Sequence, residues 1–226
     1  MVGRTLALLL ARQRLRVGLV MHEPTAKEDV RAYSLNSSSR DLLSSLRCWP
    51  SPQHATPVQH MRVWGDDGGF VRFDSPTPDG LTWIVDVPVL EKHLGEAVHH
   101  QADITCLQNA APAALTVICE GRHSSTRAEL GVTFDALPYQ QHAVAARVRG
   151  SIAHRQQAFQ WFAHQGEGLE ILALLPLGGA QSDTAGLVWS LPPMRAQHML
   201  TLDAPAFCEA LQDASHGVLG QLELTS

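Results

Sequence analysis

The first residues that could do chemistry surround Gly3, which precedes an Ala/Leu-rich run and then three arginines, Arg12, Arg14 and Arg16. This pattern predicts a helix from Arg4 to Arg14 that leads into a strand over residues 17–21. A helix beginning at a glycine and followed by a strand is typical of the second half of a nucleotide-binding βαβ unit. Only the last glycine of a G-x-G-x-x-G fingerprint could be Gly3. The residues alone leave two interpretations open, a phosphate-binding helix and plain α/β core.

A second candidate site follows the apolar run Leu115 to Cys119, which we predict to be a short buried strand ending at Glu120-Gly121. Ligand contacts in α/β folds lie outside the carboxyl ends of the strands. Residues 124–126 can cap a short helix there. We therefore expect ligand contacts at this turn.

The histidines and cysteines do not indicate a metal site. His99-His100 is the only histidine cluster among twelve, and neighbouring helical side chains point about 100° apart, which favours a solvated helix end. The four cysteines form no C-x-x-C pair, so neither a zinc site nor a disulfide framework is indicated, and a reducing compartment is expected. No catalytic acid or base can be named from spacing.

The composition is that of an ordinary soluble protein, with 226 residues, 45% hydrophobic and 17% charged. The net charge of -5 and the isoelectric point near 6.2 argue against a nucleic-acid partner. No apolar run is long enough to span a membrane. We expect a cytoplasmic location, with at most peripheral contact at the inner membrane.

The remaining pattern predicts an α/β (α+β) fold in which an incomplete nucleotide-binding βαβ layer is interleaved with a mostly antiparallel sheet. Polar loops are expected over residues 22–29 and 51–57, and a hairpin around Gly65–Gly69. A strand over 81–85, a helix from Pro88 and a strand over 104–107 precede the second candidate site. The later elements are strands over 142–148, 158–162, 169–175 and 185–191, the hairpin turn 165–168, and closing helices over 194–199 and 205–214. We expect Asp203 to cap the second of these helices.

These stretches resemble, in order, those of the FAD-dependent hydroxylases of ubiquinone biosynthesis, within the p-hydroxybenzoate-hydroxylase-like flavoprotein monooxygenases. The matching segments are MVGRTLALLLARQRLRVGLV, VRAYSLNSSSRDLLSSL, MRVWGDDGGFVRFD, TWIVDVPVLEKHL, ICEGRHSSTR, YQQHAVAARVR and LALLPL with GLVWSLPP. The resemblance covers essentially the whole chain. It implies a partial FAD-binding domain over 1–60 and 81–130, and a substrate-binding sheet domain with closing helices over 61–80 and 131–226.

The resemblance also implies the chemistry. NAD(P)H would reduce FAD, O2 would react with the reduced flavin, and a prenylated phenol or quinone precursor would be hydroxylated; other ubiquinone-biosynthesis proteins would be partners. The strands between His142 and Leu191 would form the pocket floor, while Tyr139, Trp161 and Trp189 are expected to pack in the core. The cofactor-binding positions that the resemblance assigns are Gly3, Arg31, Glu120, Gly121, Ser124 and Arg127.

Several residues depart from the family's pattern. Met21 stands where an acidic residue usually holds the adenosine ribose, Ile118 replaces a glycine, Glu120 replaces an aspartate, and Val87 replaces a polar residue. The chain also begins inside the family's GGGMVG motif and ends before its FPL and GDAAH motifs. We therefore expect a product truncated at both ends that binds FAD weakly or not at all. The alternative is a non-catalytic paralogue that binds a prenyl lipid or a partner hydroxylase.

Overall fold

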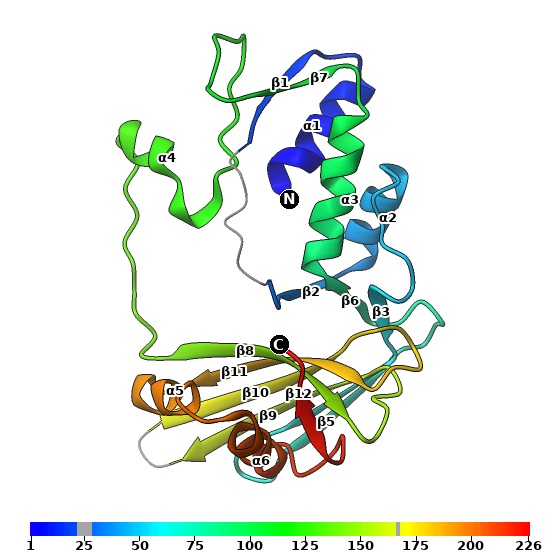
Figure 1. Cartoon of the computed structure of the whole chain (residues 1–226), viewed down its shortest axis with the longest axis vertical. Coiled ribbons are helices and arrows are strands. Elements are labelled where there is room, and N and C mark those ends of the chain that lie inside the picture. Colours follow the sequence, from blue (N-terminus) through cyan, green and yellow to red (C-terminus); the bar gives the residue numbers. More distant parts are fainter. Residues whose placement is uncertain (22–28, 166–167) are drawn as a thin grey trace. The chain divides into compact units, whose positions relative to one another are not determined.

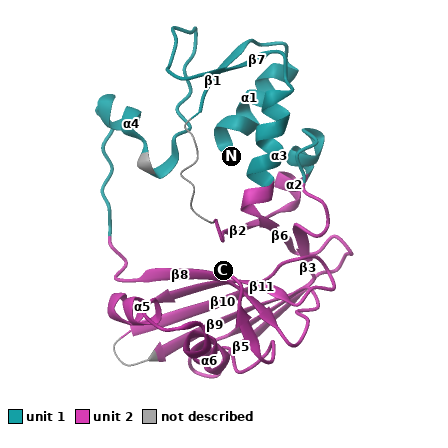
Figure 2. Cartoon of the chain, viewed as in Figure 1, with its two compact units in different colours: residues 1–27, 41–49, 90–137 teal, residues 28–40, 50–89, 138–226 magenta. Residues whose placement is uncertain are grey.

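The computed structural model of the chain describes residues 1–21, 29–165 and 168–226 (Figure 1). Apart from Asp29, the polar loop expected over residues 22–29 lies outside the described residues, as does the tip of the hairpin expected over 165–168. The chain divides into two compact units, coloured in Figure 2. Unit 1 comprises residues 1–27, 41–49 and 90–137, and unit 2 comprises residues 28–40, 50–89 and 138–226.

Unit 1 contains the predicted helix and strand at the start of the chain. Its elements are α1 (Val2–Arg12), β1 (Val17–Val20), the end of α2 (Ser37–Ser45), most of α3 (Val87–His99), β7 (Ile104–Leu107), the 3-10 helix Gly121–His123 and α4 (Ser125–Glu129). β1 and β7 form a parallel two-stranded sheet with Val17 opposite Ile104. Arg4 of α1 is bonded to Glu91 of α3, which joins the two helices. Leu94 and Val98 of α3 are buried.

The strand predicted over Leu115–Cys119 is wrong. This segment has no regular structure, and Leu115 is 77% exposed. A strand forms only where a neighbour supplies its backbone hydrogen bonds. β1 and β7 pair with each other, and no described strand pairs with residues 115–119. Its apolar composition was therefore insufficient evidence for a buried strand.

Unit 2 contains two sheets. Its strands are β2 (Ala32–Leu35), β3 (Ala55–Val58), β4 (His60–Trp64), β5 (Phe70–Asp74), β6 (Thr82–Asp86), β8 (His142–Gly150), β9 (Gln157–Gln165), β10 (Gly168–Pro176), β11 (Thr184–Leu191) and β12 (Leu222–Leu224). The larger sheet has the order β12-β8-β11-β10-β9-β4-β5, and the smaller one β2-β6-β3. The predicted β4–β5 hairpin and the strands now labelled β8 to β11 are confirmed. The loop predicted over 51–57 is wrong in its second half, because β3 pairs with β6 there.

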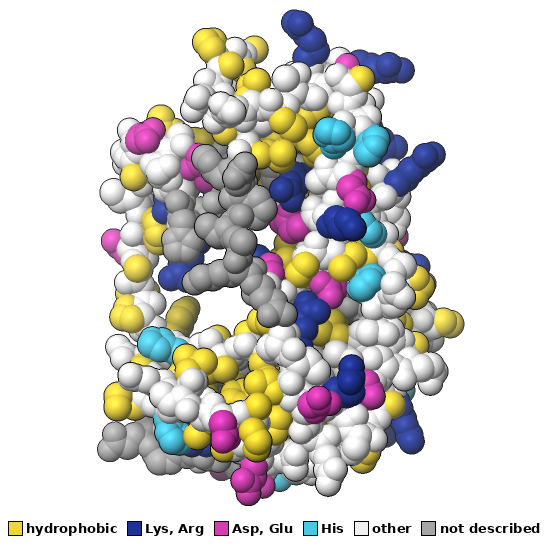
Figure 3. All heavy atoms as spheres, in the orientation of Figure 1, with side chains coloured by type: hydrophobic (Ala, Val, Ile, Leu, Met, Phe, Trp, Pro, Cys, Tyr) yellow, Lys and Arg dark blue, Asp and Glu magenta, His cyan; other side chains and the backbone are white. Residues whose placement is uncertain are grey.

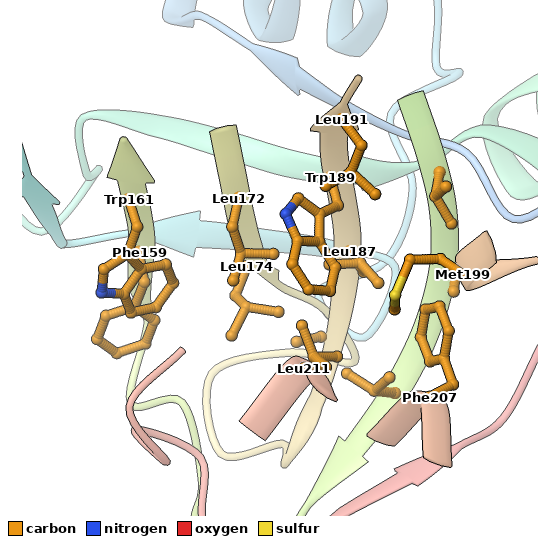
Figure 4. Packing of buried hydrophobic residues seen from close by; sticks show 14 of the residues in the cluster. Phe159, Trp161, Leu172, Leu174, Leu187, Trp189, Leu191, Met199, Phe207 and Leu211 are labelled. Carbon is orange, nitrogen blue, oxygen red and sulfur yellow. The ribbon is translucent and has the colours of Figure 1, made fainter. Parts of the chain in front are cut away.

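Two helices, α5 (Pro193–Met199) and α6 (Ala204–Ala214), cover one face of the larger sheet (Figure 1). The side chain of Asp203 caps α6 by accepting from the amide of Ala206 at 3.0 Å, as predicted. Figure 4 shows the main core of the unit between these helices and the sheet. The members labelled in Figure 4 are Phe159, Trp161, Leu172, Leu174, Leu187, Trp189, Leu191, Met199, Phe207 and Leu211. Trp161 and Trp189 are therefore core residues as expected, but Tyr139 is not, since it is 91% exposed.

Within the described residues of unit 2, other elements pack against the opposite face of the larger sheet at one end. There Ala158 and Leu177 pack against Val58 and Ile84 of the smaller sheet. Arg147 of β8 adds an ion pair with Asp86 of β6 at 2.8 Å, in which both side chains are largely buried. Loss of either partner would leave the other charge buried without compensation. The pair therefore favours the packing of the smaller sheet against the larger one.

One buried polar group, His154, ties a turn together. Its Nδ1 accepts from the amide of Gln156 at 3.0 Å, and its Nε2 donates to the carbonyl of Leu177 at 2.9 Å. The ring is therefore neutral with the proton on Nε2. Burial lowers the pKa of His154 below its ordinary value.

We expect Leu211→Ala to lower the free energy of unfolding of the chain by about 2–5 kcal/mol, because Leu211 is completely buried and the truncation leaves a cavity. Leu200→Ala is the matched control, since Leu200 is 73% exposed, and should change it by less than about 0.5 kcal/mol. Urea unfolding followed by circular dichroism measures both. Equal losses in the two variants would contradict this description of the core.

We expect the free energy of unfolding to fall as the pH drops below about 6.5, the ordinary pKa of histidine. Below that pH the imidazole of His154 is protonated in the unfolded chain, while burial keeps it neutral in the folded chain. The free energy of unfolding stops falling once the pH is below the lowered pKa of His154 in the folded chain. His154→Gln removes this titration, so the difference in unfolding free energy between pH 7.5 and pH 5 should shrink. His216→Gln, at an exposed position, should keep the wild-type difference. An unchanged difference in His154→Gln would contradict the assignment.

Candidate functional site

Gly3 lies in the first turn of α1, where helix amides have no partner within the helix. A Cβ atom at Gly3 would approach the Cβ of Cys119 to 3.2 Å and a methyl carbon of Leu19 to 4.0 Å. The absence of a side chain therefore lets α1 pack closely against the segment that precedes Glu120. Met21, at the position that the resemblance assigns to a ribose-binding acid, directly follows β1 and is partly exposed.

Four of the other predicted positions form one local cluster around α4. The carboxylate of Glu120 accepts from the hydroxyl of Ser124 at 2.6 Å, and from the hydroxyl and amide of Thr126 at 2.5 and 3.2 Å. Ser124 in turn caps α4 by accepting from the amide of Arg127 at 3.1 Å. Gly121 has a positive φ of +74°, which suits a glycine, and an added Cβ there would meet no atom within 4 Å. This turn is held by its own side chains.

The two predicted arginines also have partners. Arg127 lies over the ring of Phe134 at 4.1 Å and donates to the carbonyl of Arg122. Arg31, which belongs to unit 2, donates from two nitrogens to Asp29 at 2.7 and 2.8 Å. Hydrogen bonds and charge from Arg31 lower the pKa of Asp29. The guanidinium of Arg31 is thus held in a local ion pair.

The uncovered part of the larger sheet is a second candidate surface. Strand side chains alternate between faces, so the residues between the core positions of β8 to β11 point away from α5 and α6. Besides Arg147, Arg149 and His164, this side carries uncharged, mostly small or apolar side chains that are at least partly exposed: Ala143, Ala145, Gln160, Phe162, Ile171, Ala173, Val188 and Ser190. We call this set the open face. Ile171 lies opposite both Phe162 and Ser190 in the strand ladders, near its centre.

The resemblance predicted that these strands form the floor of the substrate pocket, but it did not indicate which of their residues do so. The signal was the run Leu169 to Leu175 in β10, where apolar residues occupy both faces of the strand except at Glu170. A strand that is apolar on both faces is expected to pack against other groups on both of them. Here α5 and α6 pack against one face of the sheet.

Neither metal ligands nor a membrane-spanning helix indicates another site among the described residues. Within the residues that the structure describes, no three His, Cys, Asp or Glu side chains come together to hold a metal ion. Nor does any described helix have the length and hydrophobicity to cross a membrane. On the face of the molecule drawn in Figure 3, Lys and Arg side chains are interspersed with Asp and Glu side chains.

The described residues fit FAD only in part. The first-turn amides of α1 suit a phosphate group. The carboxylate of Glu120 is already occupied by hydroxyl and amide donors of its own turn, and Arg31 is paired with Asp29. Binding FAD through these side chains would break existing hydrogen bonds. We therefore expect the described residues to hold FAD only weakly, chiefly through the first-turn amides of α1.

No family model matches the chain. The fold is nevertheless that of the FAD-dependent aromatic monooxygenases, as its similarity to several solved structures shows.

A variant of PqsL from Pseudomonas aeruginosa has a TM-score of 0.71 at 18% sequence identity, over 99% of this chain and 70% of that one. PqsL itself is described as a probable FAD-dependent monooxygenase. The p-nitrophenol 4-monooxygenase PnpA from Pseudomonas putida has a TM-score of 0.65 at 13% identity, over 100% of this chain and 64% of that one. Aklavinone-11 hydroxylase, solved with FAD and aklavinone, has a TM-score of 0.58 at 16% identity, over 99% of this chain and 50% of that one.

We expect this chain to bind FAD with a dissociation constant above about 10 μM, a binding free energy weaker than about 7 kcal/mol, because the local bonds of Glu120 and Arg31 compete with the cofactor. Titration of FAD fluorescence with purified protein measures it. Retention of one FAD per chain through gel filtration would contradict this expectation.

Proposed function

We propose that this chain is part of an FAD-dependent monooxygenase that hydroxylates an aromatic ring. The observation that carries the proposal is the shared fold over 99% of the chain together with the open face of the larger sheet. Bound FAD would supply oxygen transfer from O2, with NAD(P)H as the reductant. Unit 1, with α1 and the Glu120 turn, is proposed as the cofactor side, and unit 2 as the substrate side.

The open face favours an apolar aromatic substrate. Its central side chains, Phe162, Ile171 and Val188, offer apolar contact, while Gln160 and Ser190 offer polar groups beside them. Ligand sites typically combine such a lining with a few polar groups that set orientation. PqsL has been solved with 2-aminobenzoylacetate, and aklavinone-11 hydroxylase with aklavinone. For this chain we propose a prenylated phenol or quinone precursor of ubiquinone, whose tail would add further apolar contact.

In this proposal the larger sheet orients the aromatic ring of the substrate and excludes water from it. Trp189 and Leu191 anchor β11 in the core, so the neighbouring Val188 and Ser190 are held at fixed positions on the open face. A rigid apolar floor holds a ring in one orientation and removes water from it. No acid or base on the open face is needed for this role.

A single substitution tests the substrate surface. Ile171→Arg places a guanidinium at the centre of the open face, so the affinity for 2-geranylphenol, a phenol with a ten-carbon prenyl chain, should fall at least about tenfold, or ~1.4 kcal/mol. Isothermal titration calorimetry measures the dissociation constant. Leu115→Arg, at an exposed position of unit 1, should bind as the wild type does.

Wild-type affinity in Ile171→Arg would overturn the assignment of the open face, provided that its circular dichroism spectrum is unchanged. Absence of saturable binding by the wild type would overturn the proposed substrate class.

A further inference from the structure

Unit 2 contains a cavity of about 470 Å³ on the helix-bearing side of the sheet, near its β4–β5 end. Ligand pockets of proteins have about 300–1,000 Å³. The apolar walls are Trp64, Phe70, Phe159, Ile152 and Val218. Trp64 and Phe159 point to the side that carries the main core, and the open face lies on the opposite side of the sheet. The cavity is therefore distinct from the proposed substrate surface.

One wall of this cavity belongs to a stack of aromatic rings. The rings of Trp64 and Trp161 are nearly parallel, with centroids 5.0 Å apart and 5° between their planes. The ring of Phe70 is tilted by 41° to that of Trp64, with the two ring centroids 5.3 Å apart. The buried indole nitrogen of Trp161 has no hydrogen-bond partner among the described residues, and Figure 4 shows it on the side of the ring away from Leu172. Such a wall offers a flat ligand a stacking surface.

The charge of the lining is positive. Arg62 and Arg155 line the cavity, and no acidic side chain does. Arg62 is held by Asp74 at 2.9 Å, and hydrogen bonds from His60 and Arg62 lower the pKa of Asp74 to about 2, so this carboxylate stays charged at neutral pH. Arg155 is exposed and has neither an ion pair nor a side-chain hydrogen bond to any residue that the structure describes. Its guanidinium is available to a carboxylate ligand.

The turn that carries Arg155 is fixed. Arg155 and Gln156 both have left-handed backbones, with φ of 49° and 60°. Non-glycine residues rarely adopt this conformation, and it persists where surrounding bonds impose it. The hydrogen bonds of His154 to Gln156 and Leu177 impose this conformation. Arg155 is therefore held at the cavity rather than on a free loop.

We propose that this cavity is a second binding site, for an aromatic carboxylate of one or two fused rings. The ring would stack on Trp64 and Phe70, and the carboxylate would pair with Arg155. This assignment does not depend on the proposed hydroxylase function.

Calorimetric titration with naphthalene-2-carboxylate at pH 7.5 tests the site. The wild type should bind it saturably and bind the uncharged naphthalene-2-methanol at least about tenfold more weakly, since the alcohol cannot pair with Arg155. Arg155→Asn should lose about tenfold in affinity for the carboxylate, because asparagine tolerates the left-handed backbone but lacks the charge. Phe70→Ala, at an exposed rim position, should also weaken binding.

Two controls separate this site from others. Arg149→Asn removes another exposed arginine that does not line the cavity, and Ile171→Arg alters the open face, so both should keep wild-type affinity for the carboxylate. Full affinity in Arg155→Asn, equal affinity for the two naphthalenes, or no saturable binding would overturn the proposal. A loss of affinity in Ile171→Arg comparable to that in Arg155→Asn would place the ligand on the open face instead.

Discussion

The packing of α5 and α6 against one face of the seven-stranded sheet is the interaction on which the rest of unit 2 depends. Trp189, Leu191 and Leu211 are almost completely buried in this layer. Because strand side chains alternate, their burial fixes which residues of each strand point the other way. The open face is thus a consequence of core packing. The aromatic cavity is another, since it lies on the core side of the sheet and no residue of α5 or α6 lines it.

In unit 1, too, the structure of a segment depends on the segments that lie beside it. β1 and β7 pair with each other, while residues 115–119 are apolar but remain exposed and irregular. The turn that follows is stabilised locally, by the bonds of Glu120 to Ser124 and Thr126. Local hydrogen bonds therefore position the predicted cofactor-binding residues of this turn. The same bonds compete with a ligand for those groups.

Patterns within a single segment were sufficient to predict much of the fold. The Gly65–Gly69 turn between alternating strands and the capping Asp203 both carry their signals within a few residues, and both were predicted. The strand β3, the exposed Tyr139 and the irregular segment 115–119 depend on which distant residues lie beside them. For the site, the sequence predicted the strands of the floor. It could not predict that Ile171 lies opposite Phe162 and Ser190, because the ladder register sets that position.

We propose that the open face, and not the core face, holds an aromatic substrate. Carbene footprinting with and without 2-geranylphenol, read residue by residue by mass spectrometry, tests it most directly. Bound ligand should reduce labelling at Phe162, Ile171 and Val188, with no change at Phe70 or Leu115. Protection confined to Phe70 and the residues around it, or unchanged labelling of all three open-face residues under saturating ligand, would contradict it.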